Sequence, residues 1–154
     1  MKEKICSFCG HRDADSSLRA QIKETITDII VNEGITIFYS GGIGNFDMLC
    51  ESVVRELKRT YPLKLYLIMP YMTQKINRDG KYYKELYDDI IIPDLGEVHY
   101  KRAITERNKW IAEQSHIILC YIHRSSGGAY RMYQYAKKHN INTRVLSLNN
   151  LHLK

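Results

Sequence analysis

The chain has 154 residues, of which 44% are hydrophobic and 26% charged, a composition that fits one globular, soluble domain spanning residues 1–154. No apolar run approaches the roughly 18 residues that a membrane-spanning helix needs, and the start MKEKICSF lacks the apolar core of a secretory signal, so we expect a cytoplasmic protein with no membrane partner. The net charge of +6 permits anionic ligands, including nucleotides and nucleic acid, but does not choose among them.

Short apolar runs alternate along the chain with stretches in which apolar residues recur at helical spacing. Gly34 and the pair Tyr61-Pro62 end the first two helical stretches, and Pro70 and Pro93 close two of the apolar runs. In chain order, we expect a strand at 5–8, a helix at 18–30, a strand at 35–39, a helix at 46–57, a strand at 63–69, a short helix near 82–87, a strand at 89–92, a helix at 100–114, a strand at 117–122, a helix at 128–139 and a last strand at 144–148.

This alternation predicts an α/β fold of the Rossmann-like, three-layer kind, with a mostly parallel sheet and helices on both faces. In such folds, ligands bind beyond the carboxyl ends of the strands, at the point where the strand order reverses. Three strands are followed by turns that suit this position: Gly10-His11-Arg12, Ser40–Gly44 and Ser125–Gly128.

The polar segment at residues 71–88 is rich in tyrosine and is expected to be a loop with one short helix. Tyr82, Tyr83 and Tyr87 lie near the expected ligand edge, where they could form a lid or an oligomer contact. Packing of amphipathic rings at the surface is the favoured interpretation, ahead of a direct role in ligand binding.

Four cysteines stand at positions 6, 9, 50 and 120. Cys6 and Cys9 form a CxxC pair, but a zinc site needs a second pair of ligands, and the other two cysteines lie in unrelated segments. A redox dithiol favours a helix N-terminus, whereas Cys6 falls inside an apolar run. We therefore expect packing roles for the cysteines, and we expect no metal and no cofactor.

The first glycine turn, Ser40-Gly41-Gly42-Ile43-Gly44, precedes a helix, where bare backbone and free N–H groups attract ligands. Counted from Gly42, Asp47 takes the third glycine position of G-x-G-x-x-G, so a standard dinucleotide site is not expected. A carboxylate in the first helical turn repels a phosphate. It suits a ribose hydroxyl, or it merely complements the helix dipole, and the sequence leaves both alternatives open.

The second glycine turn, Ser125-Ser126-Gly127-Gly128, differs because no acid follows it in the first helical turn, where Tyr130 stands. His123 and Arg124 precede the turn and add positive charge. Bare N–H groups, hydroxyls and cationic side chains predict a phosphate cradle. The alternative is a tight strand-to-helix turn in which glycine only relieves steric crowding.

Arg107 shares a helix face with Ile104 and Ile111 by its spacing, with Asn108 beside it. A guanidinium within an apolar stripe needs a partner, because burial of an unpaired charge is costly. The partner is either an internal carboxylate or an anionic group of a ligand. We expect the guanidinium and both glycine turns to converge on one pocket that receives a phosphorylated sugar.

Five segments stand in a recognisable order: CSFCGHR, FYSGGIGNFDMLCESVVRELK, LYLIMPY, YDDIIIP and AITERNKWIAEQSHIILCYIHRSSGGAYRMYQYAKK. Together they resemble the SLOG superfamily, named for DprA/Smf and the Lonely-guy proteins, and within it the YpsA-like branch of bacteria and phages. The resemblance covers about residues 4–148. It implies a Rossmann-like domain that binds nucleotides or nucleotide-derived ligands such as ADP-ribose-type molecules, and it implies a homodimer by analogy.

The resemblance also implies ligand-binding roles for residues in four motifs. They are the GHR motif after the first strand, the first glycine motif, the RN motif and the second glycine motif, which correspond here to Gly10, His11, Arg12, Gly41, Gly42, Gly44, Arg107, Asn108, Gly127 and Gly128.

Lonely-guy enzymes hydrolyse the N-glycosidic bond of nucleoside 5′-monophosphates with an arginine and a glutamate, the latter from the motif P-G-G-x-G-T-x-x-E. The resemblance places Ser126 at the proline, Tyr130 at the third glycine and Gln134 at the catalytic glutamate. Cleavage through an oxocarbenium-like transition state needs a negative charge near the sugar. An enzyme would therefore need Asp47 or Glu51 as a non-standard carboxylate.

Three functions follow as hypotheses. The favoured one is binding or sensing of a nucleotide-like small molecule, with its phosphate on Ser126–Gly128 and Arg107, its ribose near Asp47, and base stacking on Tyr71 or Tyr130. The second is a nucleotide N-glycosidase, and the third is single-stranded DNA binding. DNA is not favoured, because the basic residues are interrupted by acids and spread over several helices.

Overall fold

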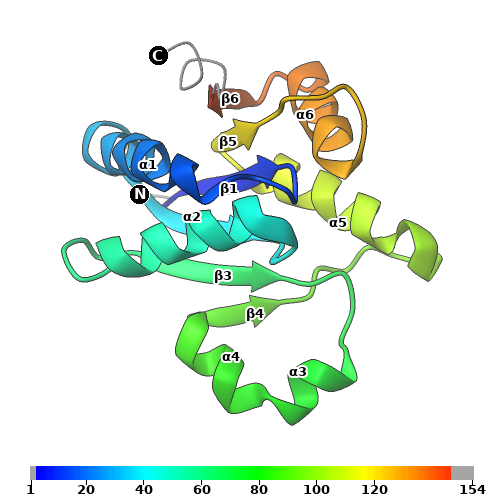
Figure 1. Cartoon of the computed structure of the whole chain (residues 1–154). Helices are drawn as coiled ribbons and strands as arrows, with labels where there is room; N and C mark the ends of the chain where they lie inside the picture. The colour runs from blue at the N-terminus through cyan, green and yellow to red at the C-terminus, as the bar shows by residue number, and fades with distance from the viewer. Residues whose placement is uncertain (1–2, 147–154) are drawn as a thin grey trace.

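The structure is a computed structural model and describes residues 3–146. The described chain forms one parallel sheet in the order β4-β3-β2-β1-β5-β6 (Figure 1). The strands are β1 (Lys4–Gly10), β2 (Ile35–Ser40), β3 (Lys64–Ile68), β4 (Asp89–Ile91), β5 (Ile117–Tyr121) and β6 (Asn142–Leu146). The helices are a short 3-10 turn (Ser16–Leu18), α1 (Arg19–Glu33), α2 (Gly44–Leu57), α3 (Gln74–Arg78), α4 (Gly80–Leu86), α5 (Tyr100–Gln114) and α6 (Gly128–Lys138).

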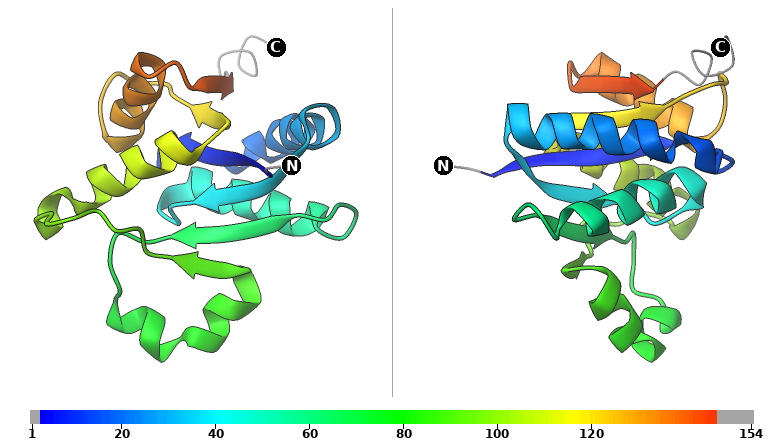
Figure 2. Two further views of the ribbon diagram at one scale, coloured as in Figure 1. Left: turned by 180° about the vertical axis from the view of Figure 1, so that it is seen from behind. Right: turned by 60° about the vertical axis from the view of Figure 1, so that its left-hand side comes forward.

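The expected Rossmann-like α/β fold is confirmed, and every pair of neighbouring strands in the described sheet is parallel. Helices α1 and α2 cover one face of the sheet, and α5 and α6 cover the other, as the views in Figure 2 also show. Side chains of a strand alternate between the two faces. Phe8 accordingly packs with α1 and α2, whereas Cys9 packs with α5 and α6.

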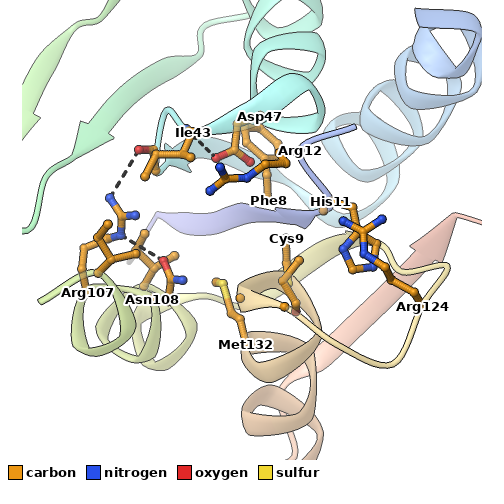
Figure 3. Close-up of a pocket in the computed structure, with 17 residues that line it drawn as sticks. Phe8, Cys9, His11, Arg12, Ile43, Asp47, Arg107, Asn108, Arg124 and Met132 are labelled. Atoms are coloured by element: carbon orange, nitrogen blue, oxygen red, sulfur yellow. Dashed lines mark hydrogen bonds between the residues drawn. The ribbon is translucent and has the colours of Figure 1, made fainter. Parts of the chain in front are cut away.

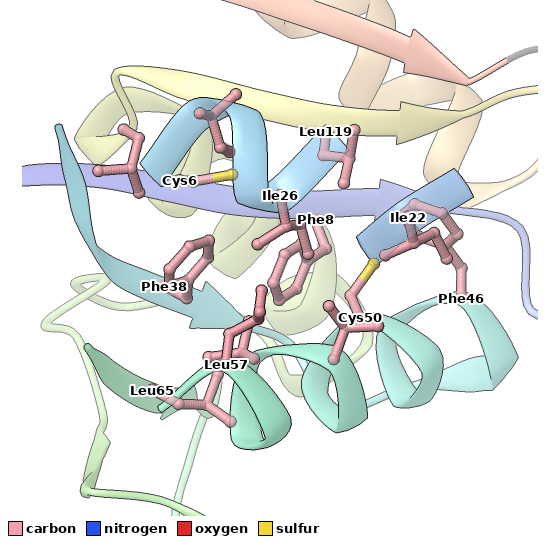
Figure 4. Packing of buried hydrophobic residues seen from close by; sticks show 14 of the residues in the cluster. Cys6, Phe8, Ile22, Ile26, Phe38, Phe46, Cys50, Leu57, Leu65 and Leu119 are labelled. Carbon is pink, nitrogen blue, oxygen red and sulfur yellow. The ribbon is translucent and has the colours of Figure 1, made fainter. Parts of the chain in front are cut away.

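The core under α1 and α2 is the larger of the two (Figure 4). Ile22 and Ile26 of α1 and Phe46 and Cys50 of α2 meet the sheet there, at the helical spacing that the sequence displays. All four cysteines are buried, as a packing role requires, and burial raises the pKa of the Cys50 thiol above its usual value.

Most element boundaries lie within three residues of the sequence prediction, and two differences are worth describing. The segment at residues 71–88 contains two helices, α3 and α4, rather than one near 82–87, because the Thr73 side chain accepts a hydrogen bond from the Ile76 N–H at 3.3 Å and Ile76 is buried. Strand β6 begins at Asn142 rather than 144, and the last two positions of the predicted strand, 147 and 148, lie outside the described residues.

The sheet order fixes where a ligand site can form. Successive strands β1 to β4 run outward on one side of β1, and β5 and β6 lie on its other side, so the order reverses at β1. The carboxyl end of β1 therefore stands between the turns that follow β2 and β5, where parallel sheets of this type bind ligands. Within residues 3–146, none of the helices has the length and apolarity that a bilayer crossing requires.

Candidate functional site

A cavity of about 330 Å³ opens at this reversal point, bounded by the ends of β1, β2 and β5, by α5 and by the start of α6 (Figure 3). We call it the polar cavity. Its walls include nine of the residues that the sequence analysis singled out: Gly10, His11, Arg12, Gly41, Asp47, Arg107, Asn108, Gly127 and Gly128. The predicted convergence of both glycine turns and the Arg107 guanidinium on one pocket is therefore what the geometry displays.

Arg107 is 2% exposed and reaches the cavity wall from α5. Its Nη1 donates to the carbonyls of Ile68 at 2.7 Å and Gly41 at 3.3 Å, and its Nε donates to the Asn108 side chain at 2.9 Å. Among the described residues, no carboxylate forms an ion pair with this guanidinium. The internal partners of Arg107 are thus two backbone carbonyls and the Asn108 amide oxygen rather than a paired carboxylate.

The first glycine turn makes room for this guanidinium. A methyl group added at Gly41 would lie 3.2 Å from Cζ of Arg107, closer than ordinary packing allows. Burial lowers the pKa of Arg107, and the negative charge of Asp47 acts in the opposite direction. A guanidinium keeps its proton in proteins, so the wall of the cavity carries a buried positive charge.

Asp47 lies in the first turn of α2, is 8% exposed and lines the polar cavity. Its Oδ2 accepts a hydrogen bond from the Ile43 N–H at 3.3 Å, so the carboxylate satisfies the start of its own helix. Burial raises the pKa of Asp47 to about 7, and the charge of Glu51 adds to the rise, while the Ile43 hydrogen bond and Arg107 oppose it. The carboxyl group therefore changes its charge near neutral pH.

Glu51 occupies a different environment one helical turn further along α2. It is fully buried, accepts hydrogen bonds from Ser40 and from Tyr87 at 2.7 Å, and pairs with Arg55 at 3.0 Å. Ser40 in turn accepts a hydrogen bond from the Gly42 N–H at 3.1 Å. Neither Glu51 nor Ser40, both candidates from the sequence, lines the polar cavity; both brace the first glycine turn from behind.

Four other predicted positions also lie off the polar cavity. A methyl group at Gly44 would meet the backbone of Arg12 at 2.6 Å, so this glycine allows α2 to pack against the end of β1. Ser126 is exposed on the second turn. The Tyr130 hydroxyl accepts a hydrogen bond from Gln134 at 3.1 Å, and Tyr130 is not among the residues that line the cavity. Gly42 belongs instead to a neighbouring cavity.

His11 follows β1 and is 2% exposed, with its ring against His123 at a centroid distance of 4.6 Å. Its Nε2 is buried and has no hydrogen-bond partner within residues 3–146. Burial lowers the pKa of His11, and the positive charge of Arg124 lowers it further. At neutral pH the cavity thus holds an uncharged imidazole whose nitrogen is unsatisfied, a costly state that a ligand hydroxyl or phosphate would relieve.

The second glycine turn leads into α6, where Gly127 takes a left-handed φ of 92° and caps the helix. No acidic residue stands in the first turn of α6. Arg124 reaches the cavity from the same turn. It pairs with Asp13 at 3.0 Å, an ion pair that the sequence analysis did not anticipate. His123 and Arg124 hold the pKa of Asp13 below its usual value.

The apolar part of the cavity wall was not predicted. Ile43, Ile104 and Met132 contribute to it. For Ile104 the signal was present, because it precedes Arg107 by three residues and lies on the same helix face. Ile43 immediately precedes α2, whereas Met132 lies in α6 on the other face of the sheet, and no local pattern indicates that they line one cavity.

Comparison with known proteins identifies a matching family and several structures of similar fold. A family model described as the YspA SLOG family matches residues 3–151. A comparison with curated protein sequences found no match.

Solved structures of similar fold include DNA processing protein A (DprA) from Streptococcus pneumoniae, with a TM-score of 0.67 and 13% identity, covering 95% of this chain and 52% of that one. The chain therefore spans about half the length of this protein. DprA from Helicobacter pylori, described with a single-stranded DNA binding mode, gives a TM-score of 0.64 at 14% identity over 95% of this chain and 67% of that one. The molybdenum cofactor carrier protein of Chlamydomonas reinhardtii gives 0.58 at 14% identity, over 93% of this chain and 76% of that one.

Proposed function

This chain belongs to the YspA SLOG family, and from that premise we propose that it binds a nucleotide or nucleotide-derived ligand, a phosphorylated ribose compound, in the polar cavity. One observation carries the proposal. Arg107 is a buried cation with no carboxylate partner in the described chain, and it shares its cavity with the unsatisfied Nε2 of His11 and the bare amides of Gly127 and Gly128.

The phosphate would lie between the second glycine turn and Arg107. The N-terminus of α6 offers free N–H groups and the positive end of a helix dipole, and the first turn of this helix contains no acidic residue. The low dielectric around a buried guanidinium strengthens its attraction for phosphate. The ribose would lie toward Asp47 and His11, because a carboxylate and a neutral imidazole both form hydrogen bonds with hydroxyl groups.

Two of the fold neighbours support a binding function at a coarse level. One is described as binding single-stranded DNA and another as a carrier of the molybdenum cofactor. Their ligands differ greatly in size, so the ligand of this chain has to be inferred from its own cavity.

The expected homodimer and the expected single domain stay predictions. Light scattering measures the oligomeric state, and limited proteolysis tests the single domain.

Isothermal titration with AMP, ADP-ribose and ribose 5-phosphate tests the proposal. We expect dissociation constants below 1 mM for at least one of these probes, on the order typical of metabolite sites, and a loss of at least about tenfold in Arg107→Lys, which keeps the charge but not the planar fork. Arg102→Lys is the matched control, because Arg102 is exposed on the same helix and lies outside the cavity.

Folding of each variant is checked by its thermal transition, since Arg107 also holds two backbone carbonyls. Absence of binding to every probe at millimolar concentration, with a folded wild-type chain, would contradict the proposal. Equal loss in Arg102→Lys would show that the effect is not specific to the cavity.

A nucleotide N-glycosidase is the second candidate, and Asp47 favours it as the carboxylate that lines the cavity. Water would attack C1′ of a nucleoside monophosphate, the glycosidic electron pair would leave with the base, and the water proton would pass to Asp47 and from there to the departing base. The products are the free base and ribose 5-phosphate, and the ionised carboxylate stabilises the oxocarbenium-like transition state. Release of free base that is lost in Asp47→Asn would establish this activity.

Single-stranded DNA is a weaker proposal because the structure pairs several basic side chains with acids. Arg19 pairs with Glu56 at 2.9 Å, and Lys58 pairs with Asp88 at 2.7 Å. Paired charges neutralise the phosphate attraction that drives nonspecific DNA binding. Binding of an oligonucleotide that weakens steeply with salt and survives Arg107→Lys would favour DNA over the small ligand.

A further inference from the structure

A second cavity, of about 280 Å³, adjoins the polar cavity, and we call it the tyrosine cavity. It lies between α2, the end of β3 and the arch that α3 and α4 form on the way to β4, which Figure 1 shows below the sheet. The two cavities share four residues: Gly41, Ile43, Ile104 and Arg107. Each lies near the lower limit of the roughly 300–1,000 Å³ typical of ligand sites, whereas the two together fall well inside that range.

The walls of the two cavities differ in chemistry. The polar cavity carries Arg12, Arg124, Asp47 and His11. The tyrosine cavity is lined mainly by aromatic and apolar side chains, among them Tyr71, Tyr82, Tyr83, Tyr87, Leu67 and Met48. A ligand that fills both must therefore have one anionic, hydroxylated end and one flat, largely apolar end.

The inner wall of the tyrosine cavity is rigidly built. Tyr87 is buried, donates a hydrogen bond to Glu51 at 2.7 Å and carries the Arg55 guanidinium 5.3 Å above its ring. Tyr83 stacks on Tyr87 at a centroid distance of 6.3 Å. A methyl group at Gly42 would lie 2.7 Å from Leu67, so the first glycine turn is packed tightly against this wall.

The outer wall presents two tyrosine rings that the protein itself covers only in part. Tyr71 is 43% exposed and Tyr82 is 53% exposed, although both line the cavity. Neither hydroxyl takes part in a hydrogen bond within the described part of the chain. Open tyrosine faces beside a cavity are suited to stack on a flat heterocycle, because every base has a π-face.

We propose that the tyrosine cavity receives the aromatic heterocycle of the same ligand whose phosphorylated sugar lies in the polar cavity. The inference rests on the proposed function and names its ligand class: a phosphorylated ribose compound that carries a base, and not a simple sugar phosphate. Such a ligand would extend past Gly41 and Arg107, which line both cavities. Residues 71–87 thus act as the part of the site that recognises the base. The sequence analysis named Tyr71 as one candidate for base stacking but favoured surface packing for Tyr82, Tyr83 and Tyr87.

Paired titrations of AMP and ribose 5-phosphate test this inference, because the two probes differ only in the base. We expect AMP to bind at least tenfold more tightly than ribose 5-phosphate to the wild-type chain. Tyr71→Ser should weaken AMP at least fivefold and change ribose 5-phosphate less than twofold. Tyr82→Ser is a second variant of the same wall, and Tyr100→Ser, exposed on α5 outside both cavities, is the control.

Photocrosslinking gives an independent readout of where the base lies. With 8-azido-AMP, we expect the adduct in the peptide spanning residues 71–87. An adduct on Tyr130 or elsewhere on α6 would overturn the inference.

Different outcomes contradict the proposed function and the role of the tyrosine cavity. Equal affinities for AMP and ribose 5-phosphate, unchanged in both tyrosine variants, would overturn the role of the tyrosine cavity and leave the polar cavity as a sugar phosphate site. No binding of either probe at millimolar concentration would overturn the proposed function and this inference with it.

Discussion

The two glycine turns at the carboxyl edge of the sheet differ in what surrounds them. In the first turn, at residues 40–44, a methyl group added at Gly44 would lie 2.6 Å from Cα of Arg12. In the second turn, a methyl group at Gly127 or Gly128 would have no neighbour within 4 Å. The same residue type is therefore required by internal packing in one turn and not in the other.

Glycine can be required by the protein's own packing and backbone conformation, or by a ligand that approaches the backbone. The structure distinguishes these two reasons, whereas a sequence motif does not. Gly127 is explained by its left-handed φ of 92°, which other residues adopt only with strain. Gly128 has neither a positive φ nor a close neighbour among the described residues, yet it lines the polar cavity. The proposed ligand site supplies a physical reason for glycine at this position, because a bare backbone lets a ligand approach closely.

The largest effect is expected in the first turn. Gly44→Ala places a side chain against the Arg12 backbone at a φ of 88°, and steric overlap and strain add, so we expect a loss of roughly 2–5 kcal/mol in unfolding free energy. Urea denaturation measures it. Gly34→Ala is the matched control, because Gly34 has a φ of 73° and no close neighbour, and strain alone should cost roughly 1–2 kcal/mol. Equal losses would remove the packing argument for the first turn.

The second-largest effect is expected at Asp47, the acid in the first helical turn after the first glycine turn. The helix after the second glycine turn has no acid at its start. Because the folded pKa of Asp47, about 7, lies above its unfolded value, the folded state holds the proton longer. Stability contributed by this group is then fully present at acid pH and falls as the pH rises from about 4 to about 7.

Asp47→Asn removes this titration and keeps an oxygen that can accept from Ile43. We expect the gain in unfolding free energy over wild type to be larger at pH 8 than at pH 5, by roughly 2–3 kcal/mol. Thermal or urea unfolding at the two pH values checks it. A gain that does not depend on pH would show that Asp47 is ionised in the folded state throughout this interval.

The smallest effect on stability is expected in the second turn, where a substitution should instead weaken ligand binding. Gly128→Ala should change the unfolding free energy by less than about 1 kcal/mol, because alanine is accepted at the start of a helix. Binding of AMP should weaken by about tenfold, or roughly 1.4 kcal/mol, since the methyl group stands between the ligand and the backbone.

Gly80→Ala is the matched control for this substitution. Gly80 also begins a helix, also lacks a neighbour within 4 Å, and lines neither cavity. Unchanged AMP affinity in both variants would break the comparison between the turns, because Gly128 would then have no role in binding.

Much of the fold and part of the site follow from local patterns in the sequence. Apolar runs that alternate with helical spacing specify parallel strands covered by helices, since each element must bury its apolar side. Parallel strands bring their carboxyl ends to one edge, so the turns at 10–12, 40–44 and 125–128 were expected to meet. The position of Arg107 on an apolar helix face likewise indicated a buried guanidinium in need of a partner.

Tertiary structure alone decided which side chains face the cavity. Asp47 and Glu51 are four residues apart on α2 and look equivalent in sequence, yet one lines the polar cavity and the other is enclosed by Ser40, Arg55 and Tyr87. The tyrosine cavity depends in the same way on packing between α2, β3 and the arch of α3 and α4. Local periodicity sets which face of an element is buried, but the partner on that face comes from segments distant in the chain, and it is the partner that determines charge, pKa and access.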